Sequence, residues 1–306
     1  LTVYAYGTPG DWDGTASYSW DIFNANSASG FSAGNFTMNL DNFGIAAGNR
    51  TGTWAFSNPS GGIIRVSYTP LSDPVWAGGT GSFSTGFSPA ASDGDDLFFS
   101  GAGGTATNDT LTSAGSITFM IGAGAYTLSG NAITVTGAVT NNSSSTQTLN
   151  TNVTPGSIVI NDGVVEIGAS GRLGGGSTSA TISNSGTLIY SGTNDQTLSG
   201  VISGSGALTK NGSGTLTLSA ANTYSGGTTV NSGSLILTGG SGRIVGALTV
   251  NGSGVAQYSV NSHNYFGTLS SLTISNGGTF IDGAIGSYVQ SAPSVTFNNG
   301  GTLTSA

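Results

Sequence analysis

The residues best suited to bind a metal ion are the closely spaced carboxylates Asp93, Asp95 and Asp96, and a second acidic pair, Asp11 and Asp13, lies near the N-terminus. Carboxylate oxygens are the ligands that hard cations such as Ca²⁺ prefer. The spacing matches no EF-hand loop, and aspartates also form turns where a strand begins. The sequence therefore offers Asp93, Asp95 and Asp96 as a candidate calcium site, with a turn as the alternative, and it indicates no other cofactor.

Few residues could act as catalysts. His263 is the only histidine, so no pair of histidines can bind a metal, and there is no cysteine to serve as a ligand, a nucleophile or half of a disulfide. No Gly-x-Ser-x-Gly phrase stands at a strand-to-helix turn, which argues against a serine hydrolase elbow. Glu166 is the only glutamate, and we expect it on a strand beside a turn. These residues favour a protein that is not an enzyme.

The cations are sparse as well. They are Arg50, Arg65, Arg172, Lys210 and Arg243. Because they are scattered, they cannot neutralise a track of phosphates, and nucleic acid is not an expected partner. A crosslink between Lys210 and an asparagine would require the lysine to be buried beside a carboxylate. We expect instead that Lys210 simply ends a strand before the next turn.

The composition excludes several classes of protein. Only 6% of the 306 residues are charged, against about 25% in an ordinary soluble domain. The 53 glycines follow no Gly-X-Y period, which excludes collagen, and 36% apolar residues with so little charge argue against disorder. No apolar run approaches the ~20 residues of a membrane-spanning helix, so we expect no membrane insertion. The composition is typical of a turn-rich β-protein whose surface consists of Ser, Thr and Asn.

The strongest pattern is an internal repeat. Seven segments share an alternating strand, a turn of the form Asn-x-Gly or close to it, and a second alternating strand. They are 157–167, 180–190, 207–218, 228–237, 247–255, 272–281 and 295–304, and their turn asparagines are Asn161, Asn184, Asn211, Asn231, Asn251, Asn276 and Asn299. The position of the turn asparagine advances from 161 to 299 in six steps, so the mean step is 23.

Such a repeat predicts a solenoid of about 23 residues per coil, in which each strand pairs in parallel with its copy in the next coil. Alternation places Leu216 and Leu218 inside and the intervening threonine outside. The turn requires a positive φ, which we expect at Gly233, and stacked asparagine side chains can hydrogen-bond from coil to coil. The alternative is an antiparallel sandwich, since Asn-Gly is also a hairpin signal. A sandwich gives no reason for seven copies of one phrase.

The N-terminal part differs in composition. Residues 1–73 concentrate the aromatic residues and contain longer alternating segments, which predicts an aromatic-rich antiparallel β block that caps or packs beside the coil. Residues 74–306 would form the parallel β-helix, with an entry segment at 74–100. The aromatic residues fit a packed core, and a platform on which sugars stack is the alternative.

The segment 206–237, from Gly-Ala-Leu-Thr-Lys-Asn-Gly-Ser-Gly through Ser-Gly-Ser-Leu-Ile-Leu, resembles the autotransporter-associated β-strand repeat of bacterial passenger regions and giant surface proteins. Residues 76–99 resemble the segment that often precedes these coils, and 17–69 resemble the block that often closes a long repeat. The resemblance implies a right-handed parallel β-helix, export to the bacterial cell surface, and a structural or adhesive role. It carries no catalytic residues.

The order of the parts suggests one module cut from a tandem array: a closing block, an entry segment, and then coils that stop in mid-pattern. Open strand edges are templates for pairing. We therefore expect a non-enzymatic, extracellular structural protein that associates with itself, head to tail or laterally, into a surface filament. The alternatives are an adhesin passenger that binds surface glycans and, with less support, a polysaccharide lyase or hydrolase, since those enzymes also use parallel β-helices.

Overall fold

A computed structural model describes residues 2–4, 18–24, 37–39, 53–57, 63–69, 73–238, 244–258, 269–282 and 294–305. The chain divides into two compact units, Leu1–Asp73 and Pro74–Ala306. Among the described residues, no helix is both long and apolar enough to cross a membrane.

The described part of the N-terminal unit consists of two small sheets. The strands are β1 (Thr2–Tyr4), β2 (Tyr18–Asn24), β3 (Thr37–Asn39), β4 (Thr53–Ser57) and β5 (Ile63–Thr69). Strand β5 lies between β2 and β4 and is antiparallel to both, whereas β1 and β3 pair in parallel. The described strands of this unit therefore pair both in parallel and antiparallel, whereas the sequence predicts an antiparallel block.

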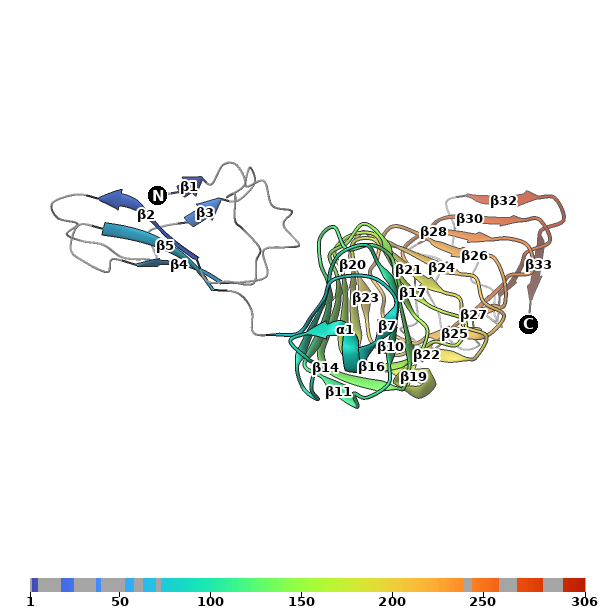
Figure 1. Cartoon of the computed structure of the whole chain (residues 1–306). Helices are drawn as coiled ribbons and strands as arrows, with labels where there is room; N and C mark the ends of the chain where they lie inside the picture. The colour runs from blue at the N-terminus through green and yellow to red at the C-terminus, as the bar shows by residue number, and fades with distance from the viewer. Residues whose placement is uncertain are drawn as a thin grey trace. The chain divides into compact units, whose positions relative to one another are not determined.

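The second unit is a parallel β-solenoid, as the repeat predicts (Figure 1). Its longest sheet, the 11-strand sheet, contains β7 (Gly81–Ser82), β10 (Gly104–Asn108), β13 (Tyr126–Gly130), β15 (Thr146–Leu149), β17 (Val164–Ile167), β21 (Thr187–Tyr190), β24 (Ala207–Lys210), β26 (Thr228–Val230), β28 (Gly246–Val250), β30 (Leu269–Ser275) and β32 (Val295–Asn298).

Two further sheets complete the coils. The 10-strand sheet contains β6 (Val75–Trp76), β8 (Phe87–Ser88), β9 (Asp96–Phe99), β11 (Ser113–Ala114), β12 (Ser116–Phe119), β14 (Ile133–Asn141), β16 (Asn152–Ile160), β18 (Arg172–Leu173), β20 (Thr181–Asn184) and β23 (Ile202–Ser203). The 7-strand sheet contains β19 (Ser177–Thr178), β22 (Gln196–Leu198), β25 (Thr215–Leu218), β27 (Ser234–Leu237), β29 (Val255–Tyr258), β31 (Thr279–Asp282) and β33 (Thr302–Ser305). Two short helices, α1 (Phe83–Gly86) and the 3-10 turn η3 (Gly174–Gly176), lie between strands.

The coil is shorter than the turn asparagines suggest. In the 11-strand sheet, the residues that pair directly across neighbouring strands form columns along the solenoid. One outward-facing column runs from Thr105 to Thr296 through ten paired strands. The coils of the solenoid are spaced ~21 residues apart. The mean step of 23 is too long because the asparagines do not all stand at the same corner.

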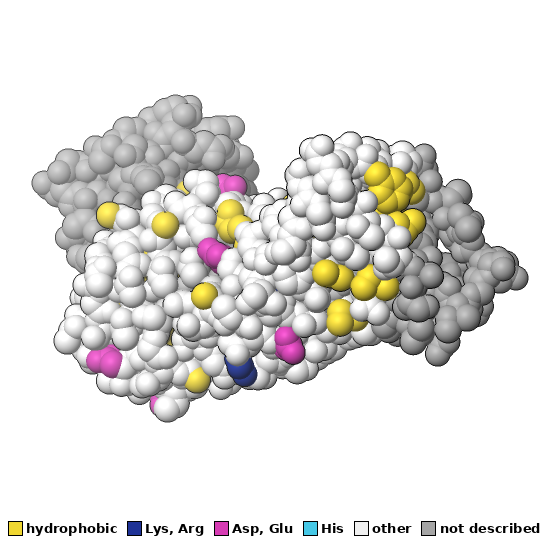
Figure 2. All heavy atoms as spheres, turned by 90° about the vertical axis from the view of Figure 1, so that its right-hand side faces the viewer, with side chains coloured by type: hydrophobic (Ala, Val, Ile, Leu, Met, Phe, Trp, Pro, Cys, Tyr) yellow, Lys and Arg dark blue, Asp and Glu magenta, His cyan; other side chains and the backbone are white. Residues whose placement is uncertain are grey.

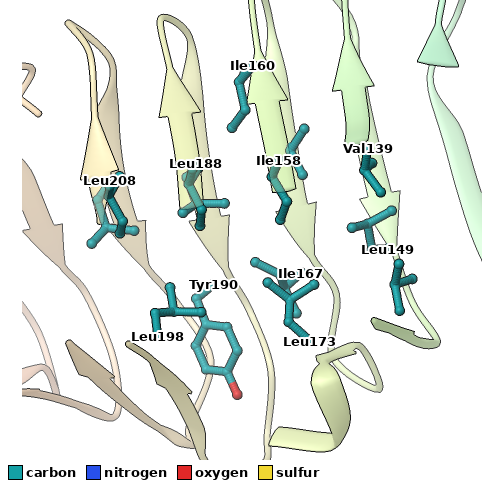
Figure 3. Packing of buried hydrophobic residues seen from close by; sticks show 14 of the residues in the cluster. Val139, Leu149, Ile158, Ile160, Ile167, Leu173, Leu188, Tyr190, Leu198 and Leu208 are labelled. Carbon is teal, nitrogen blue, oxygen red and sulfur yellow. The ribbon is translucent and has the colours of Figure 1, made fainter. Parts of the chain in front are cut away.

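The interior is filled by apolar side chains stacked from coil to coil (Figure 3). Alternate residues of each strand face inward: Leu188 and Tyr190 of β21 pair with Leu208 and Lys210 of β24. Leu216 is fully buried, and so is Leu218. Because each inward residue covers its counterpart in the preceding coil, one narrow core continues along the whole solenoid.

The N-terminal end of the solenoid is closed. The rings of Trp76, Phe83, Phe87 and Phe99 pack together with centroids 5.2–6.2 Å apart, and all four are buried. Strand β8 runs antiparallel to β6, so the outer edge of the 10-strand sheet does not continue the parallel stacking. The entry segment therefore covers the first coil with an aromatic cluster.

The C-terminal coil, in contrast, leaves apolar side chains uncovered. Val295, Phe297 and Leu303 stack on Leu272, Ile274 and Phe280, which are buried, yet they are themselves about half exposed. Figure 2 views this end and shows apolar side chains gathered there on a surface with few charged groups. We call Val295, Phe297 and Leu303 the end face.

Candidate functional site: the asparagine corners and the buried lysine

The seven turn asparagines occupy two corners of the coil, not one. Asn161 and Asn184 lie where the chain passes from the 10-strand to the 11-strand sheet, Asn161 in the turn between β16 and β17 and Asn184 as the last residue of β20. The other five lie where it passes from the 11-strand to the 7-strand sheet. The repeated phrase therefore does not mark the same corner in every coil. The long step from Asn184 to Asn211 spans one coil and one further side.

Asn184 also differs from the rest in burial. It pairs with Ile160 rather than with Asn161, it is fully buried, and its Nδ2 donates to the carbonyl of Ala207 at 2.9 Å. Its Oδ1 has no hydrogen-bond partner among the described residues. Asn161 is exposed, and its Nδ2 donates to Oδ1 of Asn142 at 2.7 Å. Asn184 is thus an interior residue and not a turn position.

The later corner carries the expected ladder of side-chain amides. Nδ2 of Asn231 donates to Oδ1 of Asn211 at 2.8 Å, and Nδ2 of Asn251 donates to Oδ1 of Asn231 at 3.2 Å. One coil further on, Nδ2 of Asn299 donates to Oδ1 of Asn276 at 3.3 Å. The hydroxyl of Ser275 joins the two runs by donating to Oδ1 of Asn251. We call this set the asparagine ladder.

Asn231 is the residue through which the ladder is tested, because it both donates and accepts. Replacing Asn231 with Ala removes two exposed hydrogen bonds, and we expect a loss of about 1 kcal/mol in the free energy of unfolding. Replacing it with Asp keeps the acceptor but removes the donor. Urea unfolding followed by circular dichroism measures both. An Ala variant as stable as the parent would show that the ladder contributes nothing.

Gly233 has the positive φ that the sequence predicts, +64°, and its surroundings are closed. A Cβ there would lie 2.6 Å from the carbonyl oxygen of Gly214 and 2.7 Å from Nζ of Lys210. Two demands therefore meet at one position: a left-handed backbone and no room for a side chain.

Lys210 is fully buried, although it is the only lysine. In the 11-strand sheet it stands in an inward column between Tyr190 and Val230. Its Nζ donates to the carbonyls of Gly212 and of Ser232, the latter at 3.1 Å, and lies 5.3 Å from the centre of the Tyr190 ring. Burial lowers the pKa of Lys210 to about 8, and the carboxylate of Asp195 opposes that shift. The ammonium thus fastens one corner to the next from within.

Sequence reasoning missed that other coils use asparagine in a similar way. Asn108 and Asn141 are the buried last residues of β10 and β14, and their Nδ2 atoms donate to carbonyls of their own turn and of the next coil. Buried Gln147 and Gln196 instead reach the preceding coil. Nε2 of Gln147 donates to the carbonyl of Gly124 and its Oε1 accepts from N–H of Tyr126, and Gln196 makes the same pair of bonds to the backbone of Leu173. The available signal was parity, since each of these residues alternates in step with inward apolar neighbours.

The structure does not gather Asp93, Asp95 and Asp96 into a metal site. In the described part of the chain, no group of three His, Cys, Asp or Glu side chains could hold a metal ion. The carboxylate of Asp93 accepts from N–H of Thr112 and Ser113, at 2.7 and 2.9 Å, and from the Thr112 hydroxyl. Asp95 accepts from N–H of Ser92 at 2.8 Å. These contacts are those of turns and of coil-to-coil links.

Three exposed carboxylates link successive coils and have lowered pKa values. Hydrogen bonds from the backbone of Ser113 lower the pKa of Asp93, the hydroxyl of Ser84 lowers that of Asp109, and the backbone of Thr215 lowers that of Asp195. A carboxyl whose pKa is lower in the folded state stabilises it at neutral pH, and the contribution disappears as the pH falls through the folded pKa.

We therefore expect the melting temperature to fall as the pH drops below about 4. Replacing Asp93 with Asn keeps a hydrogen-bond acceptor but removes the charge. The melting temperature of this variant should fall less steeply with decreasing pH, because one of the three carboxylates no longer contributes. Melting curves recorded at successive acidic pH values measure it. An identical acid dependence in the variant would show that Asp93 contributes nothing to it.

Several candidates from the sequence lie outside the described residues: His263, Asp11, Asp13, Arg50 and Arg243. Of the aromatic residues of the N-terminal unit, the described side chain is that of Phe56, which is half-buried. Glu166 faces outward on β17, where Oε1 accepts from the Ser191 hydroxyl at 2.5 Å.

Comparison with known proteins gives one match. Residues 208–237 match the passenger-associated-transport-repeat, and this span includes Lys210, Asn231 and Gly233. No curated protein and no solved structure matches the chain. The match and the parallel solenoid fit a passenger-like surface protein of the autotransporter type. Within this solenoid, the segment that holds the buried lysine and the start of the asparagine ladder is thus a repeat of the kind found in autotransporter passengers.

Proposed function

We propose that this protein is a non-enzymatic structural module of a bacterial surface protein, whose solenoid serves as a stiff spacer and associates end to end into a fibre. The passenger-type repeat at 208–237 supports the surface location. The continuous core and the coil-to-coil hydrogen bonds support a mechanical role, because every coil is held to the next along the same axis.

The observation that carries the proposal is the end face. Val295, Phe297 and Leu303 extend three buried columns and are 46%, 50% and 50% exposed. Strands β32 and β33 are the outermost described strands of their sheets at this end, so their backbone groups are open to pairing. A surface of this kind fits a further coil, whether of the same chain or of another copy.

The opposite end of the solenoid limits how association proceeds. The aromatic cluster around Trp76 covers the first coil, and the antiparallel strand β8 forms the outer edge of the 10-strand sheet, which leaves β7 as the parallel edge strand of the 11-strand sheet at this end. The proposal therefore places one side of each end-to-end contact at the end face. Two end faces packed on each other would close a dimer, so a fibre needs a head-to-tail contact. A head-to-tail contact with the first coil of another copy would require the entry segment to move away.

A non-catalytic role is part of the same proposal. It is supported by the scarcity of charged side chains and by the use of Asp93, Asp109 and Asp195 in hydrogen bonds between coils. A surface of Ser, Thr and Asn loses little hydration energy when it packs against another copy, and it has little charge to keep copies apart.

Light scattering and negative-stain microscopy over a range of protein concentrations test the proposal. We expect the mass to rise with concentration and the particles to lengthen. The double variant Phe297→Asp and Leu303→Asp should stay monomeric, while Ile121→Asp, which changes an exposed residue far from the end face, should behave like the parent. A monomeric parent at all concentrations would refute self-association. Binding on a glycan array without filaments would favour an adhesin instead.

A further inference from the structure

The corners of the solenoid contain four Asn-Gly pairs, at 211–212, 251–252, 276–277 and 299–300. In such a pair, the glycine nitrogen can attack the side-chain carbonyl carbon of the asparagine. A C–N bond forms, the side-chain amide leaves as ammonia with the proton of the attacking nitrogen, and a cyclic imide results. Water then opens the imide to aspartate or isoaspartate, so the net change is hydrolysis of an amide and needs no oxidant or reductant.

The four pairs differ in how firmly the attacking nitrogen is held. The N–H of Gly212 donates to the carbonyl of Tyr190 at 3.2 Å, and the carbonyl of Gly212 accepts from Nζ of Lys210. The N–H groups of Gly252, Gly277 and Gly300 make no hydrogen bond to a described residue. The nitrogen of Gly212 is therefore restrained, whereas no described residue restrains the other three from turning toward the asparagine.

The space around the pairs changes in the same order. A Cβ on Gly212 would run into the backbone of Ser191 and Gly192. Around Gly277 the nearest atom would be 3.5 Å away, and around Gly300 nothing lies within 4 Å. Asn276 and Asn299 are exposed and have φ of +53° and +47°, a conformation that non-glycine residues adopt at a cost. The room to rearrange thus increases toward the C-terminal end.

We propose that Asn276 and Asn299 are sites of spontaneous deamidation, and that the contacts of Gly212 protect Asn211 from the same reaction. Asn251 is intermediate: its Oδ1 accepts from the hydroxyl of Ser275, but the N–H of Gly252 is unrestrained by any described residue. The asparagines of the ladder therefore differ in their expected rate of deamidation, which increases from Asn211 toward Asn299.

The products would act on the ladder directly. Aspartate or isoaspartate at position 299 has no Nδ2 to donate to Asn276. Conversion of both residues places two carboxylates on adjacent coils, where like charges repel. Isoaspartate also adds a main-chain atom to the turn. Deamidation would therefore loosen the last corner first. This chemistry does not depend on whether the chain forms fibres.

The test is to incubate the intact protein at mildly alkaline pH and to digest it at intervals. Trypsin cleaves after Lys210 and Arg243, which separates Asn211 from the other three asparagines. Mass spectrometry with fragmentation then locates each conversion. The same chain unfolded in concentrated urea is the reference. We expect Asn276 and Asn299 to react in the folded protein at rates near the unfolded ones, and Asn211 to react at least about tenfold more slowly than when unfolded.

Two variants keep the result interpretable. Asn276→Gln retains an amide but does not form a five-membered imide readily, so position 276 should stop reacting while Asn299 continues. Asn299→Gln should do the converse. Reaction of Asn211 as fast as Asn276 and Asn299 in the folded protein would overturn the proposal. So would failure of both Asn276 and Asn299 to react while the unfolded reference reacts at all four sites.

Discussion

Replacing Gly233 with Val should unfold the coils around residues 208–258 and strongly lower the stability of the solenoid. A φ of +64° costs roughly 1–2 kcal/mol for a residue with a Cβ, and more for a β-branched one. The new side chain would also press on the carbonyl of Gly214 and on Nζ of Lys210, and such overpacking typically costs about 1–3 kcal/mol. Together these terms amount to about 2–5 kcal/mol.

Gly122→Val is the matched control. Gly122 has a φ of +80° but nothing lies within 4 Å of a Cβ built there, so only the backbone term applies. Because each coil contacts only its neighbours, hydrogen exchange read segment by segment is a better measurement than a single melting point. We expect protection to be lost around 208–258 in the Gly233 variant and only near residue 122 in the control. Equal effects of the two substitutions would show that crowding at Gly233 is unimportant.

Much of the coil was predictable from local pattern. Alternation such as Thr215-Leu216-Thr217-Leu218 sets which residues face inward, and parallel stacking follows from seven copies of one phrase. The asparagine ladder follows as well, because side chains at equal positions of adjacent coils come within hydrogen-bonding distance. These features depend only on residues near each other in sequence and on repetition.

Local pattern does not predict which corner of the coil an Asn-x-Gly turn occupies. An Asn-x-Gly phrase specifies a turn with a positive φ, but it does not specify which two of the three sheets the turn joins. The phrase therefore serves one corner at Asn161 and another from Asn211 onward, and the coil length derived from it is slightly too long. The aromatic closure of the first coil likewise depends on how Trp76, Phe83 and Phe87 come together in space.

For Lys210, the alternation of the strand predicts burial correctly, whereas the charge of the side chain argues against it. In Ala207-Leu208-Thr209-Lys210 the lysine has the same parity as Leu208, so alternation alone places it inside. Its charge suggested a position at the end of the strand, without any prediction of burial. The structure satisfies both demands, since the stem lies in the apolar column and the ammonium reaches the carbonyls of Gly212 and Ser232 at the corner.

This arrangement makes an unusual prediction for alkaline pH. The pKa of Lys210 falls from 10.5 to about 8 on folding, because burial disfavours the ammonium. Between these values the folded protein has released the proton while the unfolded chain still holds it, so the free energy of unfolding rises with pH. The rise is at most about 3 kcal/mol, from 1.36 kcal/mol per pKa unit. Asp195, which lies near Lys210, stays ionised throughout this pH range. Burial raises the pKa of Tyr190 above 10, so the loss of stability that its ionisation causes comes only at higher pH.

Two variants of Lys210 separate its charge from its packing. Lys210→Met keeps the stem and removes the ammonium; we expect its stability at neutral pH to lie within about 1–2 kcal/mol of the parent, because lost hydrogen bonds are offset by the absence of a buried charge. Its stability should no longer rise between about pH 8 and 10. Lys210→Ala leaves a gap between Tyr190 and Val230 and should cost about 2–4 kcal/mol at every pH. Urea unfolding at neutral and alkaline pH measures all three proteins, and a rise that persists in the Met variant would assign the alkaline effect to another group.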